Sequence, residues 1–337
     1  MSLEEFLSEW NNDSLFVHVQ TSGSTGAPKP MLAEKRRMLA SARITNDFLG
    51  LREGNVALLC MSLDYIAGKM MVVRSIERGM KLITVEPSGH PLNHSQLAID
   101  DCQIDFAAMV PLQVYNTLQV PEERKRLLQI RHLIIGGGAI DEALGAELKN
   151  FPNAVWSTYG MTETLSHIAL RRLSGPEASD WYIPFPSVKV SLSEDGCLVI
   201  DAPEVCPERL VTNDIAEISP QGFRILGRKD NVICSGGIKI QIEKVESRLR
   251  PFLRVPYLIS KRPDPKFGEV SVLLTEGSID EARQICERIL PKYHQPQNYA
   301  HVAQIPITET GKPARKEAAQ LAMESFLLRI NKNERDL

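Results

Sequence analysis

Residues suited to binding phosphate gather in one nine-residue segment, 21–29, which reads Thr-Ser-Gly-Ser-Thr-Gly-Ala-Pro-Lys. Its glycines let the backbone approach an anion closely, its hydroxyls can donate to phosphate oxygens, and its lysine adds a cation. It is not a Walker A loop, because that pattern needs glycine directly before the lysine and Pro28 stands there. A flexible Ser/Gly turn is the plain alternative. The candidate phosphate ligands are Thr21, Ser22, Gly23, Ser24, Thr25, Gly26 and Lys29.

Four more segments carry compact sets of glycine and polar residues, mostly where an apolar run ends. Taken singly, each has an ordinary interpretation: a glycine turn, a helix N-cap, an Asp in a loop or a solvated Gly-Lys near the C-terminus. The segments cover residues 134–139 (Ile-Ile-Gly-Gly-Gly-Ala), 157–164 (Ser-Thr-Tyr-Gly-Met-Thr-Glu-Thr), a two-part segment of 212–214 (Thr-Asn-Asp) and 226–240 (beginning Leu-Gly-Arg-Lys-Asp), and 305–312 (Ile-Pro-Ile-Thr-Glu-Thr-Gly-Lys).

In this order, the five segments resemble the motifs of the adenylate-forming superfamily. That superfamily comprises acyl- and aryl-CoA synthetases, luciferases and the adenylation domains of peptide synthetases. The resemblance extends from about residue 15 to residue 312. One departure is Asn213, which stands where the family's Thr-Gly-Asp pattern has glycine, although Asn also tolerates positive φ.

The resemblance implies a role for each matching residue. It implies that Gly136, Gly137 and Gly138 lie beside adenine, that Tyr159 and Gly160 belong to a stacking motif, and that Asp214 and Arg228 bind ribose or phosphate. Thr162 would contact the α-phosphate, Glu163 would hold Mg²⁺, and Asp230 would be the hinge between two domains. Gly236 and Gly237 would line the coenzyme A channel. Lys312 would align the acid's carboxylate with the α-phosphate, an arrangement typical of in-line attack between anions.

The implied activity is an ATP-dependent acid–thiol ligase that forms an acyl-AMP and then an acyl-CoA, with Mg²⁺ as cofactor. Within the superfamily, residues 62–80 and 159–164 look most like 2-succinylbenzoate–CoA ligases of menaquinone synthesis. Such an acid has two carboxylates, so one must be held while the other reacts. The resemblance assigns Tyr65 to the gate of the acyl pocket, and the cations or hydrogen-bond donors nearby are Lys69, Arg74 and His167. Another aryl- or acyl-CoA ligase, a carrier-protein-loading enzyme and a non-catalytic nucleotide-binding protein remain as alternatives.

The elements that must position these residues follow from the hydrophobic pattern. Short apolar runs at 15–20, 56–61, 81–85, 106–110, 132–135 and 154–157 alternate with amphipathic stretches at 34–48, 65–78 and 141–150. This alternation predicts an α/β fold with a largely parallel sheet flanked by helices. Hairpin signals at 194–196 and 219–222 predict a β-rich module over about 187–227. We therefore expect a large domain over 1–228 and a small, mobile α+β domain over 229–337.

The amino-acid composition limits which binding partners and which cellular compartment are expected. The formal net charge is -3, with 39 basic and 42 acidic residues, and this gives no electrostatic case for nucleic acid or an anionic membrane. The six scattered cysteines and the lack of a signal peptide or an apolar run of membrane-spanning length favour the cytoplasm. Most relatives carry a longer segment before the phosphate loop. We therefore expect a trimmed fold whose exposed apolar faces a homodimer could cover.

Overall fold

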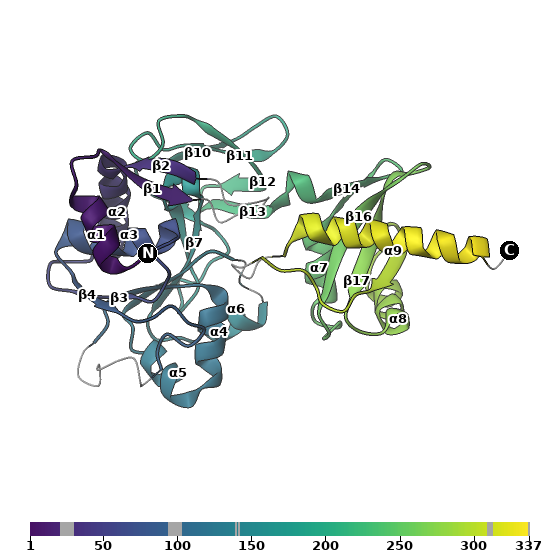
Figure 1. Cartoon of the computed structure of the whole chain (residues 1–337), viewed down its shortest axis with the longest axis horizontal. Coiled ribbons are helices and arrows are strands. Elements are labelled where there is room, and N and C mark those ends of the chain that lie inside the picture. Colours follow the sequence, from purple (N-terminus) through teal and green to yellow (C-terminus); the bar gives the residue numbers. More distant parts are fainter. Residues whose placement is uncertain (21–29, 94–102, 139, 141, 309–312, 336–337) are drawn as a thin grey trace.

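The computed structural model describes the backbone of residues 1–20, 30–93, 103–138, 140, 142–308 and 313–335, and side chains as far as 327 (Figure 1). A seven-stranded sheet forms the centre of its larger part, in the order β4-β3-β5-β6-β7-β8-β9. The first five strands are parallel, whereas β8 and β9 are antiparallel at one edge. The strands are β3 (Val56–Leu59), β4 (Lys81–Thr84), β5 (Phe106–Met109), β6 (His132–Ile135), β7 (Ala154–Gly160), β8 (His167–Arg172) and β9 (Ile183–Pro184). The α/β prediction is confirmed.

Both faces of this sheet are covered, as expected for parallel strands that are apolar on each side. Along β5, Phe106 and Ala108 face one core while Ala107 and Met109 face another. The first core also takes in α2 (Lys35–Leu49) and α3 (Ile66–Arg78). The second takes in α4 (Pro111–Gln119), α5 (Pro121–Leu127) and α6 (Glu142–Leu148).

The first predicted strand lies outside the large sheet, which corrects the simple alternating pattern. β1 (Phe16–Gln20) pairs only with β2 (Pro30–Glu34), in a separate antiparallel hairpin. Its side chains alternate between exposed and buried, which is typical of a half-covered antiparallel strand. The N-terminal helix α1 (Leu3–Asn11) contributes Phe6 to the same core as the hairpin, and a capping box between Ser2 and Glu5 begins it.

The two predicted hairpins are confirmed in a four-stranded antiparallel sheet, β10-β11-β12-β13. Its strands are β10 (Lys189–Leu192), β11 (Cys197–Asp201), β12 (Leu210–Ser219) and β13 (Gly222–Arg228). A short turn, η2 (Lys229–Asn231), follows β13 directly, and the chain then enters a different sheet.

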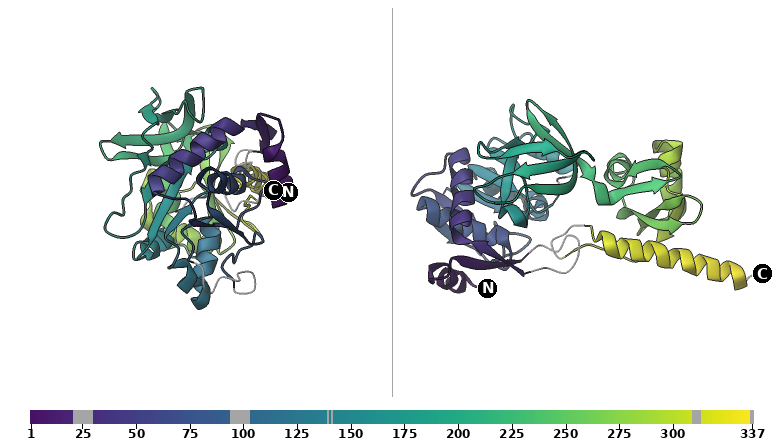
Figure 2. Two further views of the ribbon diagram at one scale, coloured as in Figure 1. Left: turned by 90° about the vertical axis from the view of Figure 1, so that its left-hand side faces the viewer. Right: turned by 90° about the horizontal axis from the view of Figure 1, so that it is seen from above.

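The residues after η2 build a second, smaller part with its own cores, seen in green and yellow in Figures 1 and 2. Its five-stranded sheet runs β15-β14-β17-β16, and β18 pairs with β17. The strands are β14 (Val232–Ser235), β15 (Ile238–Gln241), β16 (Tyr257–Asp264), β17 (Gly268–Thr275) and β18 (Asn298–His301), and the helices are α7 (Ile242–Leu249), α8 (Ile279–Ile289) and α9 (Arg315–Arg335).

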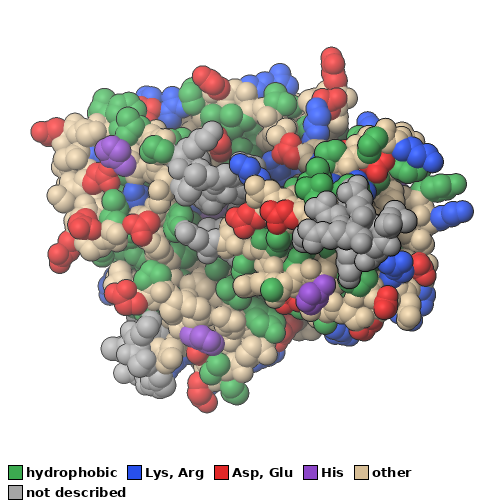
Figure 3. Space-filling view, turned by 45° about the vertical axis from the view of Figure 1, so that its right-hand side comes forward, with side chains coloured by type: hydrophobic (Ala, Val, Ile, Leu, Met, Phe, Trp, Pro, Cys, Tyr) green, Lys and Arg blue, Asp and Glu red, His purple; other side chains and the backbone are tan. Residues whose placement is uncertain are grey.

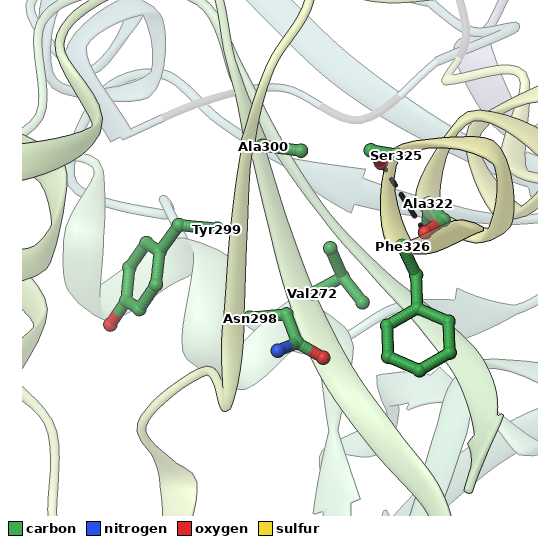
Figure 4. Close-up of a pocket in the computed structure, with 7 residues that line it drawn as sticks. All are labelled: Val272, Asn298, Tyr299, Ala300, Ala322, Ser325 and Phe326. Carbon is green, nitrogen blue, oxygen red and sulfur yellow. Dashed lines mark hydrogen bonds between the residues drawn. The ribbon is translucent and has the colours of Figure 1, made fainter. Parts of the chain in front are cut away.

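A small pocket lies in this second part, between α9 and the strands β17 and β18 (Figure 4). Phe326 and Val272 approach each other across it, whereas the Tyr299 ring lies on the other side of β18. None of its lining residues belongs to a predicted site. We interpret it as a packing gap between helix and sheet.

Candidate functional site

The glycine segment after β6 lies at the carboxyl end of the parallel strands, where ligands usually bind in open α/β sheets. Gly136 donates its backbone N–H to Met109 O at 3.1 Å, so the segment follows the end of β5. A Cβ on Gly136 would lie 2.4 Å from Thr158 Oγ1, and Gly137 has a φ of +80°. The neighbouring strand β7 therefore leaves room only for glycine here. Gly137 and Gly138 are exposed, as a shelf for a ligand would be.

Three of the predicted nucleotide-binding residues meet in one hydrogen-bonded cluster. Tyr159 Oη donates to Asp214 Oδ2 at 2.6 Å, and Arg228 Nη1 donates to Asp214 Oδ1 at 3.0 Å. Arg228 Nη2 donates to Asp230 Oδ2 at 2.9 Å, and Asn213 Nδ2 reaches the same oxygen at 3.2 Å. These residues come from β7, β12, β13 and η2, so the fold joins motifs that are far apart in the sequence.

Burial and the Asp214 carboxylate raise the pKa of Tyr159 well above its usual range, so its phenol stays a donor. Burial would lower the pKa of Arg228, but the hydrogen bond with Asp230 and the charges of Asp214 and Asp230 outweigh it and raise that pKa. Each carboxylate oxygen of Asp214 thus accepts a hydrogen bond from a strong donor, one from Tyr159 and one from Arg228.

Two aromatic residues that the motif analysis did not single out hold the Tyr159 ring. Its centroid lies 5.1 Å from that of Phe223, edge to face, and 5.8 Å from that of Tyr182. Tyr182 is anchored in turn by a 2.8 Å hydrogen bond between its hydroxyl and Ser157 Oγ. Their spacing in the sequence carries no signal, because the contact depends on how β13 and the residue just before β9 pack against β7.

The loop after β7 is tightly constrained. Thr162–Thr164 form a 3₁₀ turn, Met161 N donates to Thr164 Oγ1 at 3.1 Å, and Leu165 has a φ of +64°. This conformation costs a bulky residue about 1 kcal/mol or more, and such strain clusters at functional sites. The turn leaves Glu163 exposed and Thr162 half-buried, open to a ligand.

Gly160 should be intolerant of any side chain. A Cβ there would lie 2.3 Å from Ser166 O and 2.4 Å from His167 Cα, and backbone atoms cannot move aside cheaply. We expect Gly160→Ala to lower the free energy of unfolding by about 1–3 kcal/mol. Urea unfolding followed by tryptophan fluorescence measures this, since Trp10, Trp156 and Trp181 all lie in the larger part. Gly145→Ala is the control, because the nearest atom lies 4.0 Å away and a helix gains stability from alanine. Equal stability of both variants would contradict the packing account.

Comparison with known proteins agrees with this geometry. The family model described as AMP-binding enzyme matches residues 4–208, more than half of the chain. The chain belongs to the AMP-binding enzyme family.

A 2-succinylbenzoate–CoA ligase from Listeria monocytogenes is 26% identical over 341 residues, which cover 92% of this chain and 71% of that protein. An acyl-CoA synthetase (AMP-forming)/AMP-acid ligase II-like protein from Dyadobacter fermentans is 32% identical, with a TM-score of 0.63 and coverage of 93% and 91%. The o-succinylbenzoate CoA synthetase from Bacillus subtilis, solved with its acyl-adenylate intermediate, has a TM-score of 0.74 at 24% identity, with coverage of 89% and 68%. The family's adenylate-forming fold is therefore the fold of this chain.

Among the predicted substrate residues, the fold brings Arg74 and His167 together directly behind the 161–165 loop. Arg74 Nη2 donates to Ser166 Oγ, and Ser166 Oγ lies 3.2 Å from His167 Nδ1. Burial lowers the pKa of Arg74 to about 9, and burial together with the Arg74 charge holds the pKa of His167 well below its usual range. His167 is therefore neutral beside a cationic Arg74 at neutral pH.

Lys69 lies elsewhere, although it belongs to the same helix as Arg74. Its ammonium donates to His18 O on β1 and lies 5.8 Å from the centroid of the Phe6 ring. Burial lowers its pKa, partly offset by the charges of Glu9 and Asp64. Lys69 thus links α3 to the hairpin β1–β2. Tyr65 is half-buried at the N-terminus of α3, where Gly68 packs against Ser62 O.

The glycines assigned to the coenzyme A channel form the turn between β14 and β15. Gly236 and Gly237 have φ values of +56° and +85°, and both are exposed. Gly236 N donates to Phe267 O at 2.8 Å, which fixes the turn against the β16–β17 hairpin.

Two groups of predicted residues lie outside the described part of the chain: the phosphate segment with Thr21, Ser22, Gly23, Ser24, Thr25, Gly26 and Lys29, and Lys312.

The described residues on both sides of position 312 are held by specific contacts. Ile307 forms a β-bridge with Pro313, and Arg315 donates to both carboxylate oxygens of Glu246 at 2.7 Å. This bidentate pair ties the start of α9 to α7, and sequence analysis missed it.

The described residues hold no cluster of three or more His, Cys, Asp or Glu side chains suited to a metal. Glu163 is a single exposed carboxylate, which fits Mg²⁺ that takes its other oxygens from phosphates and water.

Charges of both signs are interspersed over the face in Figure 3. Among the helices that the structure describes, none combines the length and the hydrophobicity that a membrane span requires.

Proposed function

We propose that this chain activates a carboxylic acid with ATP as an acyl-AMP and transfers the acyl group to coenzyme A. The observation that carries the proposal is the Tyr159–Asp214–Arg228 cluster beside the glycine segment at the carboxyl ends of the parallel strands. The glycine segment offers a bare backbone surface, Tyr159 offers an aromatic ring, and the Asp214 carboxylate can accept hydrogen bonds from ribose hydroxyls. The names of the curated relatives support the same chemistry.

The reaction runs in two steps. In the first, a carboxylate oxygen of the acid bonds to the α-phosphorus and the bond to pyrophosphate breaks. Thr162 donates to the α-phosphate, Lys312 lies between the two anions, and residues 21–29 hold the departing phosphates. In the second, the thiol of coenzyme A loses its proton and bonds to the acyl carbon, and AMP leaves. No covalent bond to the protein forms in either step.

Glu163 would hold Mg²⁺ together with phosphate oxygens. When bound, the ion would stabilise charge that develops on the phosphates. The role of the protein at this point is to present one carboxylate from a strained, fixed loop.

We also infer that residues 1–228 and 229–337 act as separate domains that turn about Asp230. The bond between Arg228 and Asp230 is suited to a hinge, because their side chains are 39% and 49% exposed. A pair this exposed contributes only about 0–1 kcal/mol, so it can break at low cost. Rotation would take Lys312 away and bring Gly236 and Gly237 to the acyl-AMP.

The substrate that we propose is 2-succinylbenzoate, the acid in the names of the relatives. Arg74 is the feature that supports an acid with a second carboxylate. It is 2% exposed, its Nε lacks a hydrogen-bond partner, and it has no ion-pair partner among the described residues. A buried charge of this kind is costly unless it is paired, and a substrate anion would pair it.

A screen of carboxylic acids for pyrophosphate release tests the function. We expect 2-succinylbenzoate to give the highest kcat/KM, with coenzyme A as the acceptor. Transfer to a carrier protein instead, or a preference for another acid, would point to a different ligase of the family. Nucleotide binding without turnover of any acid would indicate a non-catalytic protein.

The cytoplasmic location and the homodimer stay predictions. The five described cysteines are free, in keeping with a reducing cytoplasm. Phe16 and Leu32 on the β1–β2 hairpin are 43% and 55% exposed, and Leu15 just before it is 71% exposed; a homodimer could cover this apolar surface.

A further inference from the structure

Four side chains from three elements form one continuous hydrogen-bonded chain behind the 161–165 loop. It runs from Arg74 on α3 through Ser166 and His167, at the start of β8, to Thr45 on α2. Ser166 Oγ lies 3.2 Å from His167 Nδ1, His167 Nε2 lies 3.1 Å from Thr45 Oγ1, and Thr45 Oγ1 lies 3.1 Å from Ser41 O. Arg74, His167 and Thr45 are 2%, 8% and 0% exposed, so water cannot replace these bonds freely.

The chemistry of the groups gives the chain a single direction. A guanidinium can only donate, so Ser166 Oγ accepts from Arg74. Thr45 Oγ1 donates to Ser41 O and so accepts from His167 Nε2, which leaves Nδ1 of the neutral ring to accept the Ser166 hydrogen. A neutral His167 that accepts at Nδ1 must carry its hydrogen on Nε2, and it donates that hydrogen to Thr45. Thr45 passes its hydrogen to Ser41 O, which can only accept. Each member therefore fixes the orientation of the next.

The chain uses both nitrogens of His167 but leaves part of Arg74 free. Arg74 Nε has no hydrogen-bond partner, and Nη1 contacts only Met71 Sδ at 3.9 Å, a weak acceptor. This side of the guanidinium is buried and its donors are unsatisfied, so it is the part for which a hydrogen-bond acceptor is still missing. His167, by contrast, has no ring nitrogen left for a substrate.

We propose that Thr45, Ser166 and His167 are positioning residues that hold the Arg74 guanidinium for the second carboxylate of the acid, and that His167 does not itself contact that acid. This inference rests on the proposed function. Orientation matters here because a carboxylate bound to a buried guanidinium is stripped of water and gains its energy only from well-aligned bonds. A polar network that merely links α2, α3 and β8 is the structural alternative.

The test compares Thr45→Val, which keeps the shape but removes the acceptor for Nε2–H, with Thr45→Ser, which keeps the hydroxyl. Each variant is assayed with 2-succinylbenzoate and with two monoacids, each lacking one of its carboxyl groups. We expect Thr45→Val to raise KM for the diacid about 10-fold with kcat nearly unchanged, and to leave KM for the monoacid that keeps the reacting carboxyl within about 2-fold. Ser166→Ala should raise KM for the diacid in the same way as Thr45→Val, and Thr45→Ser should have the KM values of the parent protein.

A second comparison isolates the route through Arg74. In an Arg74→Met background, Thr45→Val should have no further effect on KM for the diacid, because residues that act through one group are not additive. A structural role would instead lower kcat for every acid, or persist in that background, and either result would overturn the inference. Thermal melts check folding, and Ser166→Ala replaces Thr45→Val if the latter unfolds.

The failure of the inference and that of the proposed function look different. If the parent protein turns over acids but Thr45→Val treats diacid and monoacid alike, only the inference fails. If the parent releases no pyrophosphate with any acid, the proposed function fails. Calorimetric binding of 2-succinylbenzoate to the same variants then decides the inference, since its affinity should still depend on Thr45.

Discussion

Alanine at position 312 should reduce acid-dependent pyrophosphate release about 100- to 1,000-fold, the size of effect seen when one well-placed donor to a developing charge is removed. In the parent protein, the Lys312 ammonium is proposed to lie between two anions, the acid's carboxylate and the α-phosphate, that repel each other. Transfer from supplied acyl-AMP to coenzyme A should be spared, because no new bond to phosphorus forms in that step. Rapid-quench assays of the two half-reactions measure both effects.

Lys316→Ala is the matched control for that variant. It removes the same charge four residues later, from an exposed position on α9, and should leave both half-reactions unchanged. The Glu246–Arg315 pair keeps the flank of position 312 in place in either variant. Equal loss of the two half-reactions in Lys312→Ala, or full adenylation, would contradict the assigned role.

Arg74→Met should lower kcat/KM for 2-succinylbenzoate about 100-fold, since truncating one partner of a buried charge pair costs about 2–5 kcal/mol. The monoacid that keeps the reacting carboxyl should lose little. The preference for the diacid would thus disappear while adenylation chemistry continues. Steady-state assays with both acids measure the change in selectivity.

Lys69→Met gives the comparison, because Lys69 lies on the same helix and was an equal candidate in the sequence. Its contacts with His18 O and the Phe6 ring lead us to expect lower stability without a change in selectivity. Loss of diacid preference in Lys69→Met, with Arg74→Met unaffected, would mean that the wrong cation has been assigned.

Local patterns were enough to predict most of the fold. The strands β3, β5, β6 and β7 begin with short apolar runs, and the motifs at the ends of β6 and β7 lie at the predicted edge of the sheet. Each of these features depends on neighbouring residues, which is the information that periodicity contains.

What the sequence did not reveal depends on contacts between distant residues. Thr45 and His167 are 122 positions apart, and Glu246 and Arg315 are 69 apart, so neither pair leaves a local signal. The half-buried alternation of β1 was visible, but its pairing with β2 rather than the large sheet was not. The sequence did not rank Lys69, Arg74 and His167. Packing decides between them, because Lys69 and both ring nitrogens of His167 are hydrogen-bonded, whereas Arg74 Nε is not.

The nucleotide products of a single turnover test the central claim most directly. Incubation of the protein with ATP, Mg²⁺ and 2-succinylbenzoate, without coenzyme A, should yield one pyrophosphate per enzyme-bound acyl-AMP, and added coenzyme A should release AMP. Formation of ADP and orthophosphate instead would contradict attack at the α-phosphorus and the mechanism built on it.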